Sequence, residues 1–461
     1  MNQFKKNSLT IALGLSVVSY VQADTKTSVA VQQSQQSQQS QQSQQSQQSQ
    51  QSQQSQQSQQ AEVNQLRAEV KELRNLLEQF TQTQQKQAVQ LQHVQQQPIE
   101  TTNAQKAQKP NGLSLTLAGS EINFYGNVRM DAQYQAEGGS QARLYNQISS
   151  VPIEGISERS DEFKSTLSAT RIGLDFKTPA TGKDVSGKIE VDFLGGANFD
   201  NLRIRHAYVN YGNWLIGQTW SNFAVPDYMP ETIDALAFVG SSVKRTPQVR
   251  YKHTFDPNTN LVTAVEDPKD SSISMRMPAL TTRLNHKVND ELSLSGRAMT
   301  HEKRIDSEEK WAWGIGIGVK YDFSPQTSLK ADYYHVKGDS SFVSWTNSGV
   351  LKTTSGDLVQ NEFDSITVGV TQKFNDKLRG TLGYGFMKFD EDQDYISAVA
   401  NKTASNKELW QAWANMFYSP VKPISLGVEY VYGERTALAP SANGQDTGID
   451  NRVNAVAIYN F

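Results

Sequence analysis

The chain has no cysteine among its 461 residues. This absence excludes a disulfide scaffold, cysteine-ligated zinc or iron–sulfur sites, and thiol catalysis. Long apolar runs are also missing, because no stretch of 18 or more apolar residues occurs beyond the extreme N-terminus. Only 37% of the residues are hydrophobic, and the mean hydropathy is -0.59. The composition therefore excludes a helical membrane protein.

Neither sign of charge dominates. The 44 basic and 47 acidic residues give a formal net charge of -3. Such a balance produces no overall field that would attract nucleic acid or an acidic membrane surface. We therefore expect no nucleic-acid partner.

Residues 1–23 have the three parts of a secretory signal peptide. Lys5 and Lys6 precede an apolar stretch from Leu9 to Val18, and Val21 and Ala23 stand at the two positions that determine cleavage. A buried N-terminal helix is the alternative, but it does not explain why a basic start, a short apolar core and a cleavable end occur together. The sequence therefore predicts export.

Residues 24–60 read as a flexible spacer. From Gln32 to Gln60 the sequence repeats Gln-Gln-Ser without any apolar residue. Nothing in this stretch can be buried to offset the entropy lost on ordering it.

A coiled coil is predicted over residues 61–97. Apolar residues recur there at alternating spacings of three and four: Val63, Leu66, Val70, Leu73, Leu77 and Phe80. Glu62 and Glu69 fall at g positions, and Arg67 and Arg74 at the following e positions, which suits parallel helices. A single amphipathic helix would leave this charge pairing without a purpose. The pattern mildly favours two helices and does not fix their number. Residues 98–120, which include Pro98 and Pro110, form a linker.

From Glu121 onward the apolar residues recur with a period of two. In the first segment one face carries Ile122, Phe124, Val128, Met130 and Tyr134, and the other carries Asn123, Arg129, Asp131 and Gln133. The same alternation returns in many later segments, so residues 121–461 are predicted to be all β. Short turns alternate with long polar loops, and we count about 16 antiparallel strands, as in an outer-membrane barrel with a water-filled lumen. A soluble sandwich or propeller is the alternative.

The last strand ends at Phe461. A terminal phenylalanine on an alternating strand resembles the signature by which the barrel-assembly machinery recognises outer-membrane proteins. We therefore expect the barrel in the bacterial outer membrane, with the coiled coil in the periplasm and outer-membrane lipid and lipopolysaccharide as partners. Peptidoglycan is a further candidate partner of the coiled coil.

The resemblance to known families rests on three strand segments and on the N-terminal spacer and coiled coil. The segments 168–176 (SATRIGLDF), 205–211 (RHAYVNY) and 217–220 (GQTW) resemble the general trimeric porins. Together with the spacer and the coiled coil, the chain resembles the DcaP-like porins, a family associated with uptake of dicarboxylic acids. The resemblance implies a homotrimer with a periplasmic helical stalk.

The segment 221–245 is too long and too apolar for an exposed turn. It contains Phe223, Tyr228, Ile233, Leu236 and Phe238. A loop of this kind must be covered, and in a porin it would fold into the lumen and form a constriction loop. The alternative is a loop that covers a neighbouring subunit. Gly314, Gly316 and Gly318 alternate on a later strand, where we expect them to make room in the pore.

Basic residues on the polar faces of the strands are the candidates for solute binding. The set comprises Arg129, Arg171, Arg203, Arg205, Arg250, Lys252, Arg283 and Arg297. Guanidinium groups bind carboxylates through two parallel hydrogen bonds, and a ring of them in a pore selects anions. Asp131, Asp175, Glu190 and Asp192 lie on the same faces, so each arginine alternatively belongs to an ion pair of the lumen wall.

No catalytic residue, metal site or cofactor is predicted. The six histidines are scattered, and no Ser-His-Asp set or metalloprotease motif is present. The sequence favours a channel for small anionic solutes, dicarboxylic acids above all. A phosphate-selective, sugar-selective or non-specific porin is the alternative within this class, and a structural anchor or adhesin that uses the coiled coil is the alternative outside it.

Overall fold

The computed structural model describes residue 71 and residues 113–461, except 118, 141–143, 157–158, 197–199, 237 and 345. The chain divides into two units, Met1–Lys106 and Ala107–Phe461. The predicted signal peptide, the spacer, the coiled coil except Lys71, and most of the linker lie outside the described residues. Lys71 is helical. No helix of the described part is long and apolar enough to cross a membrane.

The second unit is an antiparallel sheet of 18 strands. Its first half consists of β1 (Leu113–Leu117), β2 (Ser120–Glu137), β3 (Glu162–Thr166), β4 (Arg171–Thr178), β5 (Val185–Gly195), β6 (Asn201–Tyr211), β7 (Trp214–Trp220), β8 (Arg245–Asp256) and β9 (Thr259–Glu266). Its second half consists of β10 (Ala279–Lys287), β11 (Leu292–Ile305), β12 (Glu308–Asp322), β13 (Thr327–Lys337), β16 (Glu362–Lys373), β17 (Leu378–Phe389), β18 (Asn406–Tyr418), β19 (Ile424–Ala437) and β20 (Thr447–Asn460).

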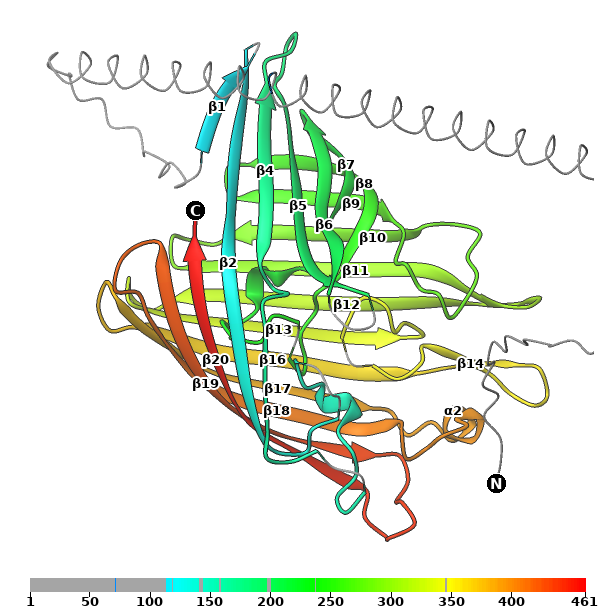
Figure 1. Cartoon of the computed structure of the whole chain (residues 1–461). Coiled ribbons are helices and arrows are strands. Elements are labelled where there is room, and N and C mark those ends of the chain that lie inside the picture. The colour runs from blue at the N-terminus through cyan, green and yellow to red at the C-terminus, as the bar shows by residue number, and fades with distance from the viewer. Residues whose placement is uncertain are drawn as a thin grey trace, which may run out of the picture. The chain divides into compact units, whose positions relative to one another are not determined.

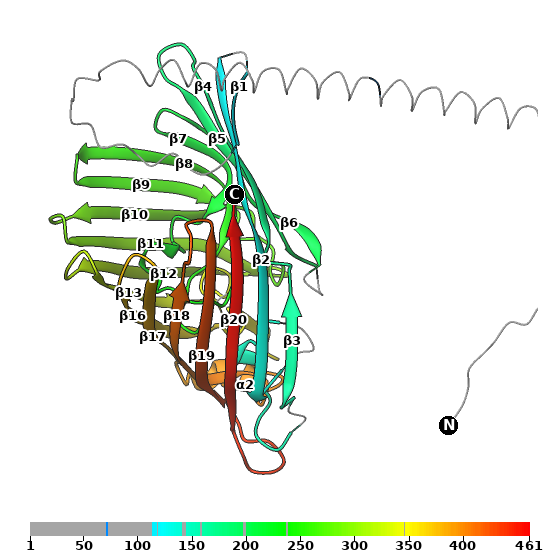
Figure 2. The same ribbon diagram turned by 60° about the vertical axis from the view of Figure 1, so that its left-hand side comes forward.

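Pairing of the first long strand with the last closes the sheet. β2 pairs with β20 on one side and with β3 and β4 on the other, so that the red strand lies beside the cyan one in Figures 1 and 2. β3 and β4 follow each other along β2 and share one position in the wall, and β1 pairs with the first residues of β2. The wall is therefore a closed barrel with 16 strand positions, which confirms the predicted fold of the barrel.

The two ends of the barrel differ in their connections. Short turns lie at the end where Phe461 pairs with Gly126, through backbone hydrogen bonds of 3.0 and 3.1 Å. The opposite end carries the long loops, which contain η1 (Ile148–Ser150), η2 (Pro226–Tyr228), β14 (Val350–Lys352), β15 (Leu358–Gln360) and α2 (Gln393–Ala398). In outer-membrane barrels the short turns face the periplasm and the long loops face outward.

The alternation read from the first strand holds in β2. Phe124, Val128 and Met130 are exposed on the outside, whereas Asp131 and Gln133 are buried on the inside. The reason is the period of two in a strand, which sends successive side chains to opposite faces of the wall. The outer face is thus apolar, as contact with lipid requires.

The buried apolar core lies between the inner wall and the loops that fold onto it. Phe223 of loop 221–244 packs edge-on against Tyr334 of β13 and Phe342 of loop 338–361, with ring centres 5.3 and 5.8 Å apart. Further along the loop, Phe238 packs on Trp413 of β18 at 4.4 Å. The apolar segment predicted to need a cover is therefore covered by the inner face of its own barrel.

Glycines on the inner wall leave room for this loop. A Cβ on Gly318 would stand 2.3 Å from the ring of Tyr228, and a Cβ on Gly385 would stand 1.8 Å from the carbonyl oxygen of Val239. The space predicted at the alternating glycines of β12 is real, but it is filled: the loop residues Phe223 and Tyr228 lie against Gly314 and Gly318, and the wall residues Tyr334 and Arg297 lie against Gly316.

Candidate functional site

Loop 221–244 is fixed to the inner wall by polar contacts around residues 231–234. Arg379 of β17 donates to both carboxylate oxygens of Glu231. The carboxylate of Glu429 on β19 accepts from the hydroxyl of Thr232 and from the backbone N–H of Ile233, both at 2.9 Å. These contacts determine where the loop lies in the lumen.

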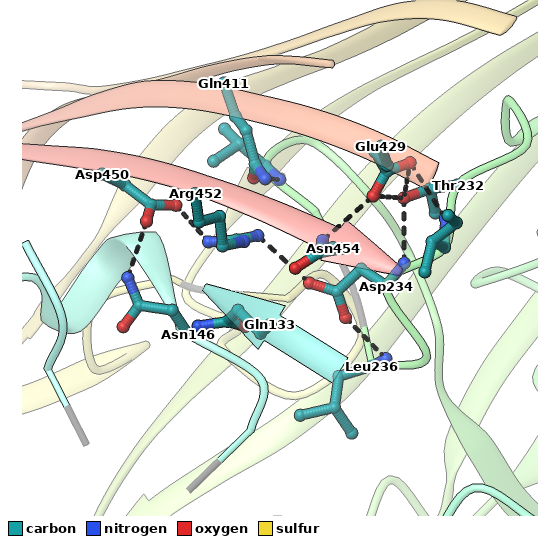
Figure 3. A network of polar contacts seen from close by, with 12 residues as sticks. Gln133, Asn146, Thr232, Asp234, Leu236, Gln411, Glu429, Asp450, Arg452 and Asn454 are labelled. Carbon is teal, nitrogen blue, oxygen red and sulfur yellow. Dashed lines mark hydrogen bonds and ion pairs between the residues drawn. The ribbon is translucent and has the colours of Figure 1, made fainter. Parts of the chain in front are cut away.

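A buried network continues from the loop into the last strand (Figure 3). The Asp234 carboxylate lies 3.3 Å from the guanidinium of Arg452 on β20, which also pairs with Asp450. Asp450 in turn accepts a 2.8 Å hydrogen bond from the Asn146 side chain of loop 138–161. Burial raises the pKa of Asp234 to about 7, against the opposing effect of Arg452. A titratable carboxyl group therefore stands at the inner edge of the loop.

A cavity of about 420 Å³ lies between the loop and the wall formed by β2, β4 and β6. Five arginines line it: Arg129 from β2, Arg171 from β4, Arg203 and Arg205 from β6, and Arg245 at the start of β8. Asp234 is the one carboxylate in the lining, and Trp220, Gln147 and Ser344 are among the other lining residues. We call this cavity the arginine pocket.

Three of the five arginines are held by carboxylates that do not line the pocket. Arg129 donates to Asp131, Arg203 to Asp192, and Arg205 to both Glu190 and Asp192, over distances of 2.6 to 3.0 Å. These carboxylates are at most 8% exposed. These three arginines therefore belong to ion pairs of the lumen wall, which was the alternative to free solute-binding groups. Their guanidinium groups line the cavity, whereas their carboxylate partners do not.

The other two guanidinium groups, those of Arg171 and Arg245, form no ion pair with any residue that the structure describes. Arg245 lies over the ring of Trp220, with its guanidinium carbon 4.5 Å from the ring centre. A cation over an indole face is stabilised without being neutralised. These two side chains therefore give the arginine pocket its excess of positive charge.

Three more of the predicted residues lie in a separate cavity of about 510 Å³, nearer the short-turn end. Arg250, Lys252 and Arg283 line it together with Asp227 of the loop. Arg297, the last predicted residue, lies in neither cavity: it is buried beneath Tyr228, ion-paired with Asp332 and hydrogen-bonded to the hydroxyl of Tyr334. The eight candidates thus divide into four, three and one.

Arg245, Trp220 and Asp234 were not among the residues proposed from the sequence. All three flank or belong to the apolar loop. Their positions in the sequence indicated a loop but did not predict where their side chains point. The available signal for Arg245 was its place as the basic last residue of the segment 221–245, which was predicted to enter the lumen.

A closed barrel with a loop folded inside it and a charged lumen defines a porin-type channel of the outer membrane. The family model of the DcaP outer membrane protein matches residues 51–461. The chain therefore belongs to this family, as the sequence resemblance predicted.

Solved structures agree with the assignment. The outer membrane channel DcaP of Acinetobacter baumannii is 37% identical, with a TM-score of 0.68 over 76% of this chain and 99% of that chain. OmpF of Salmonella typhi, solved with daunomycin, shares the fold at 15% identity and a TM-score of 0.51, over 76% of this chain and all of its own. A comparison with curated proteins finds no significant match.

Proposed function

We propose that this channel takes up small anionic solutes, dicarboxylic acids above all, by diffusion through the arginine pocket. The observation that carries the proposal is the lining of that pocket: five guanidinium groups, two of them without a carboxylate partner in the described chain, against the single carboxylate of Asp234. In this arrangement loop 221–244 acts as the constriction loop and forces the solute past the arginines.

The chemistry suits a carboxylate. A planar guanidinium group binds a carboxylate through two parallel hydrogen bonds, each charge-assisted contact being worth roughly 1.5 to 3 kcal/mol before desolvation is subtracted. Transport requires release as well as binding, so we expect half-saturation at a millimolar solute concentration. This corresponds to a binding free energy on the order of -4 kcal/mol. A dicarboxylate can contact Arg171 and Arg245 together, because both line one cavity.

The alternatives within the channel class are a phosphate-selective, a sugar-selective or a non-specific porin. Sugar pores are expected to carry a track of aromatic side chains, whereas the arginine pocket has one lining aromatic residue, Trp220. An anchor or adhesin would use the coiled coil outside the cell. The barrel's termini lie at its short-turn end, so the predicted coiled coil would stand in the periplasm.

We further propose that the chain acts as a homotrimer with a periplasmic coiled-coil stalk. The seam of the predicted coiled coil and its g-to-e charge pairs support a parallel assembly of stalks. Outer-membrane lipid and lipopolysaccharide would surround the apolar outer face, the assembly machinery would recognise the strand that ends at Phe461, and peptidoglycan would contact the stalk.

The test is the reversal potential of single channels in a potassium chloride gradient, combined with the flux of succinate. The unmodified channel should prefer anions. Lysine at Arg171 keeps the charge and loses the two-pronged geometry, so Arg171→Lys should lower succinate flux more than chloride conductance, and Arg171→Ala should lower both.

Arg159→Ala is the matched control, because Arg159 lies in loop 138–161 outside both cavities. It should leave selectivity unchanged. Cation preference in the unmodified channel, or succinate flux that is unchanged by alanine at both Arg171 and Arg245, would contradict the proposal and leave a non-specific porin.

A further inference from the structure

The cavity nearer the short-turn end is a second basic site within the same lumen; we call it the lower pocket. Arg250 of β8, Lys252 of β8 and Arg283 of β10 line it, and its other lining residues include Asn210, Asn213, Asn260 and Asn285. Amide side chains of this kind can donate to a carboxylate oxygen. Asp227 of loop 221–244 is the one acidic residue in the lining.

The lower pocket and the arginine pocket are lined by consecutive residues of loop 221–244. Pro226 lines the arginine pocket, and the next residue, Asp227, lines the lower pocket. Trp220 connects the two in the same way: its ring lies beneath Arg245, and its carbonyl oxygen accepts a hydrogen bond from Arg250. The two cavities are therefore neighbours along the loop, and the lower pocket is the one nearer the short-turn end.

Two of the three cations in the lower pocket have no carboxylate partner among the residues that the structure describes. Arg250 donates to the Gln248 side chain at 2.8 Å and to the carbonyl of Trp220, which are both neutral groups. Lys252 forms no ion pair with any residue in the described part of the chain. Their charge is available to an anion in the cavity.

The third cation, Arg283, has a weakly held partner. Its guanidinium lies 3.3 Å from one carboxylate oxygen of Asp227. The Asp227 side chain is 61% exposed, whereas that of Arg283 is only 13% exposed. An exposed carboxylate that makes a single long contact is poorly held and can be displaced by a solute that makes two.

We propose that the lower pocket is a second carboxylate-binding subsite on the periplasmic side of the constriction, and that Asp227 competes with the solute for Arg283. This inference rests on the proposed anion channel and adds the exit step to it. Two weak binding sites in series allow an anion to pass along the lumen, because neither site binds it tightly enough to trap it. Asp227 returns to Arg283 when the solute leaves, which keeps the binding weak enough for release.

The experiment uses the full-length channel in planar bilayers, with succinate added to one side at a time and the chloride current recorded. Asp227→Asn removes the competing charge and keeps the side-chain size. It should lower the half-saturating succinate concentration about two- to five-fold when succinate is added at the short-turn side. Arg250→Gln should raise that concentration by a similar factor. The effect of either change should be smaller from the long-loop side.

Asp290→Asn is the matched control. Asp290 lies in a short turn, is paired with Lys287 and lines neither cavity, so its loss changes the charge at the same end of the barrel without touching the lower pocket. It should leave the succinate dependence unchanged.

The outcomes separate this inference from the proposed function. If the unmodified channel shows neither anion preference nor a response to succinate, the proposed function fails and the subsite fails with it. If the channel responds to succinate and Arg171→Ala weakens the response, while Asp227→Asn and Arg250→Gln both leave it unchanged, the second subsite is refuted and the anion channel stands.

Discussion

The guanidinium group of Arg379 on β17 holds the carboxylate of Glu231 through two hydrogen bonds of 2.8 and 2.9 Å. Each side chain is about one third exposed, so the pair contributes little to the stability of the barrel. The pair instead positions the loop, because Glu231 lies in the middle of loop 221–244. The carbonyl oxygen of Glu231 also accepts hydrogen bonds from the side chains of Trp413 and Asn415.

Breaking this pair should loosen the loop without unfolding the barrel. We expect Arg379→Gln to increase the current noise and the frequency of brief conductance changes in single-channel records, while the free energy of unfolding falls by less than about 1 kcal/mol. Glu231→Gln should do the same, and the double variant should add little to either single variant. Fully additive effects on the noise would show that the two residues act separately.

The packing of the loop against the inner wall can be tested at Gly385. A Cβ there would lie 1.8 Å from the carbonyl oxygen of Val239, which is backbone and cannot rotate away. We expect Gly385→Ala to displace this part of the loop, to cost on the order of 1–3 kcal/mol in unfolding free energy, and to change single-channel conductance. Gly296→Ala is the control, since a Cβ there meets nothing within 4 Å. Equal behaviour of the two variants would place the loop elsewhere.

The anion preference should depend on pH near neutrality. The pKa of Asp234 is raised to about 7 by burial, so its carboxyl group is mainly neutral at pH 6 and mainly charged at pH 8. Asp234 lines the arginine pocket and faces Arg129, Arg452 and Glu429. The pocket gains positive charge as the pH falls, and the anion preference measured from reversal potentials should therefore be greater at pH 6 than at pH 8.

Asp234→Asn separates this effect from other titrations. At every pH between 6 and 8, the variant should show the selectivity that the unmodified channel has at pH 6. A pH dependence that persists in the variant would assign the titration to another group.

The barrel should not need the N-terminal region for its own fold. Deletion of residues 24–110 ends before β1 (Leu113–Leu117) and leaves all the pairings that close the wall intact. Because every strand finds its partners within the barrel, we expect the shortened protein to insert and conduct as a trimer. Bilayer conductance and chemical cross-linking would measure this, and a product that fails to insert or is monomeric would show that assembly depends on the stalk.

The sequence by itself determined the class of fold. Alternation with a period of two, as in β2, is a local property of the strand, and it places Phe124, Val128 and Met130 on one face, which is the exposed outer face of the barrel. The number of strands, the closing strand at Phe461 and the apolar loop before Arg245 follow from the same pattern and from the lengths of the connections.

Only the tertiary structure decided what each arginine does. Arg171 and Arg297 both stand on the polar faces of strands, yet Arg171 lines the arginine pocket and Arg297 is buried in an ion pair with Asp332. The difference depends on how strands far apart in sequence are placed around the barrel and on where one loop lies inside it. A carboxylate neutralises an arginine only within a few ångströms, and the period of a strand specifies a side chain's face but not its neighbours across the lumen.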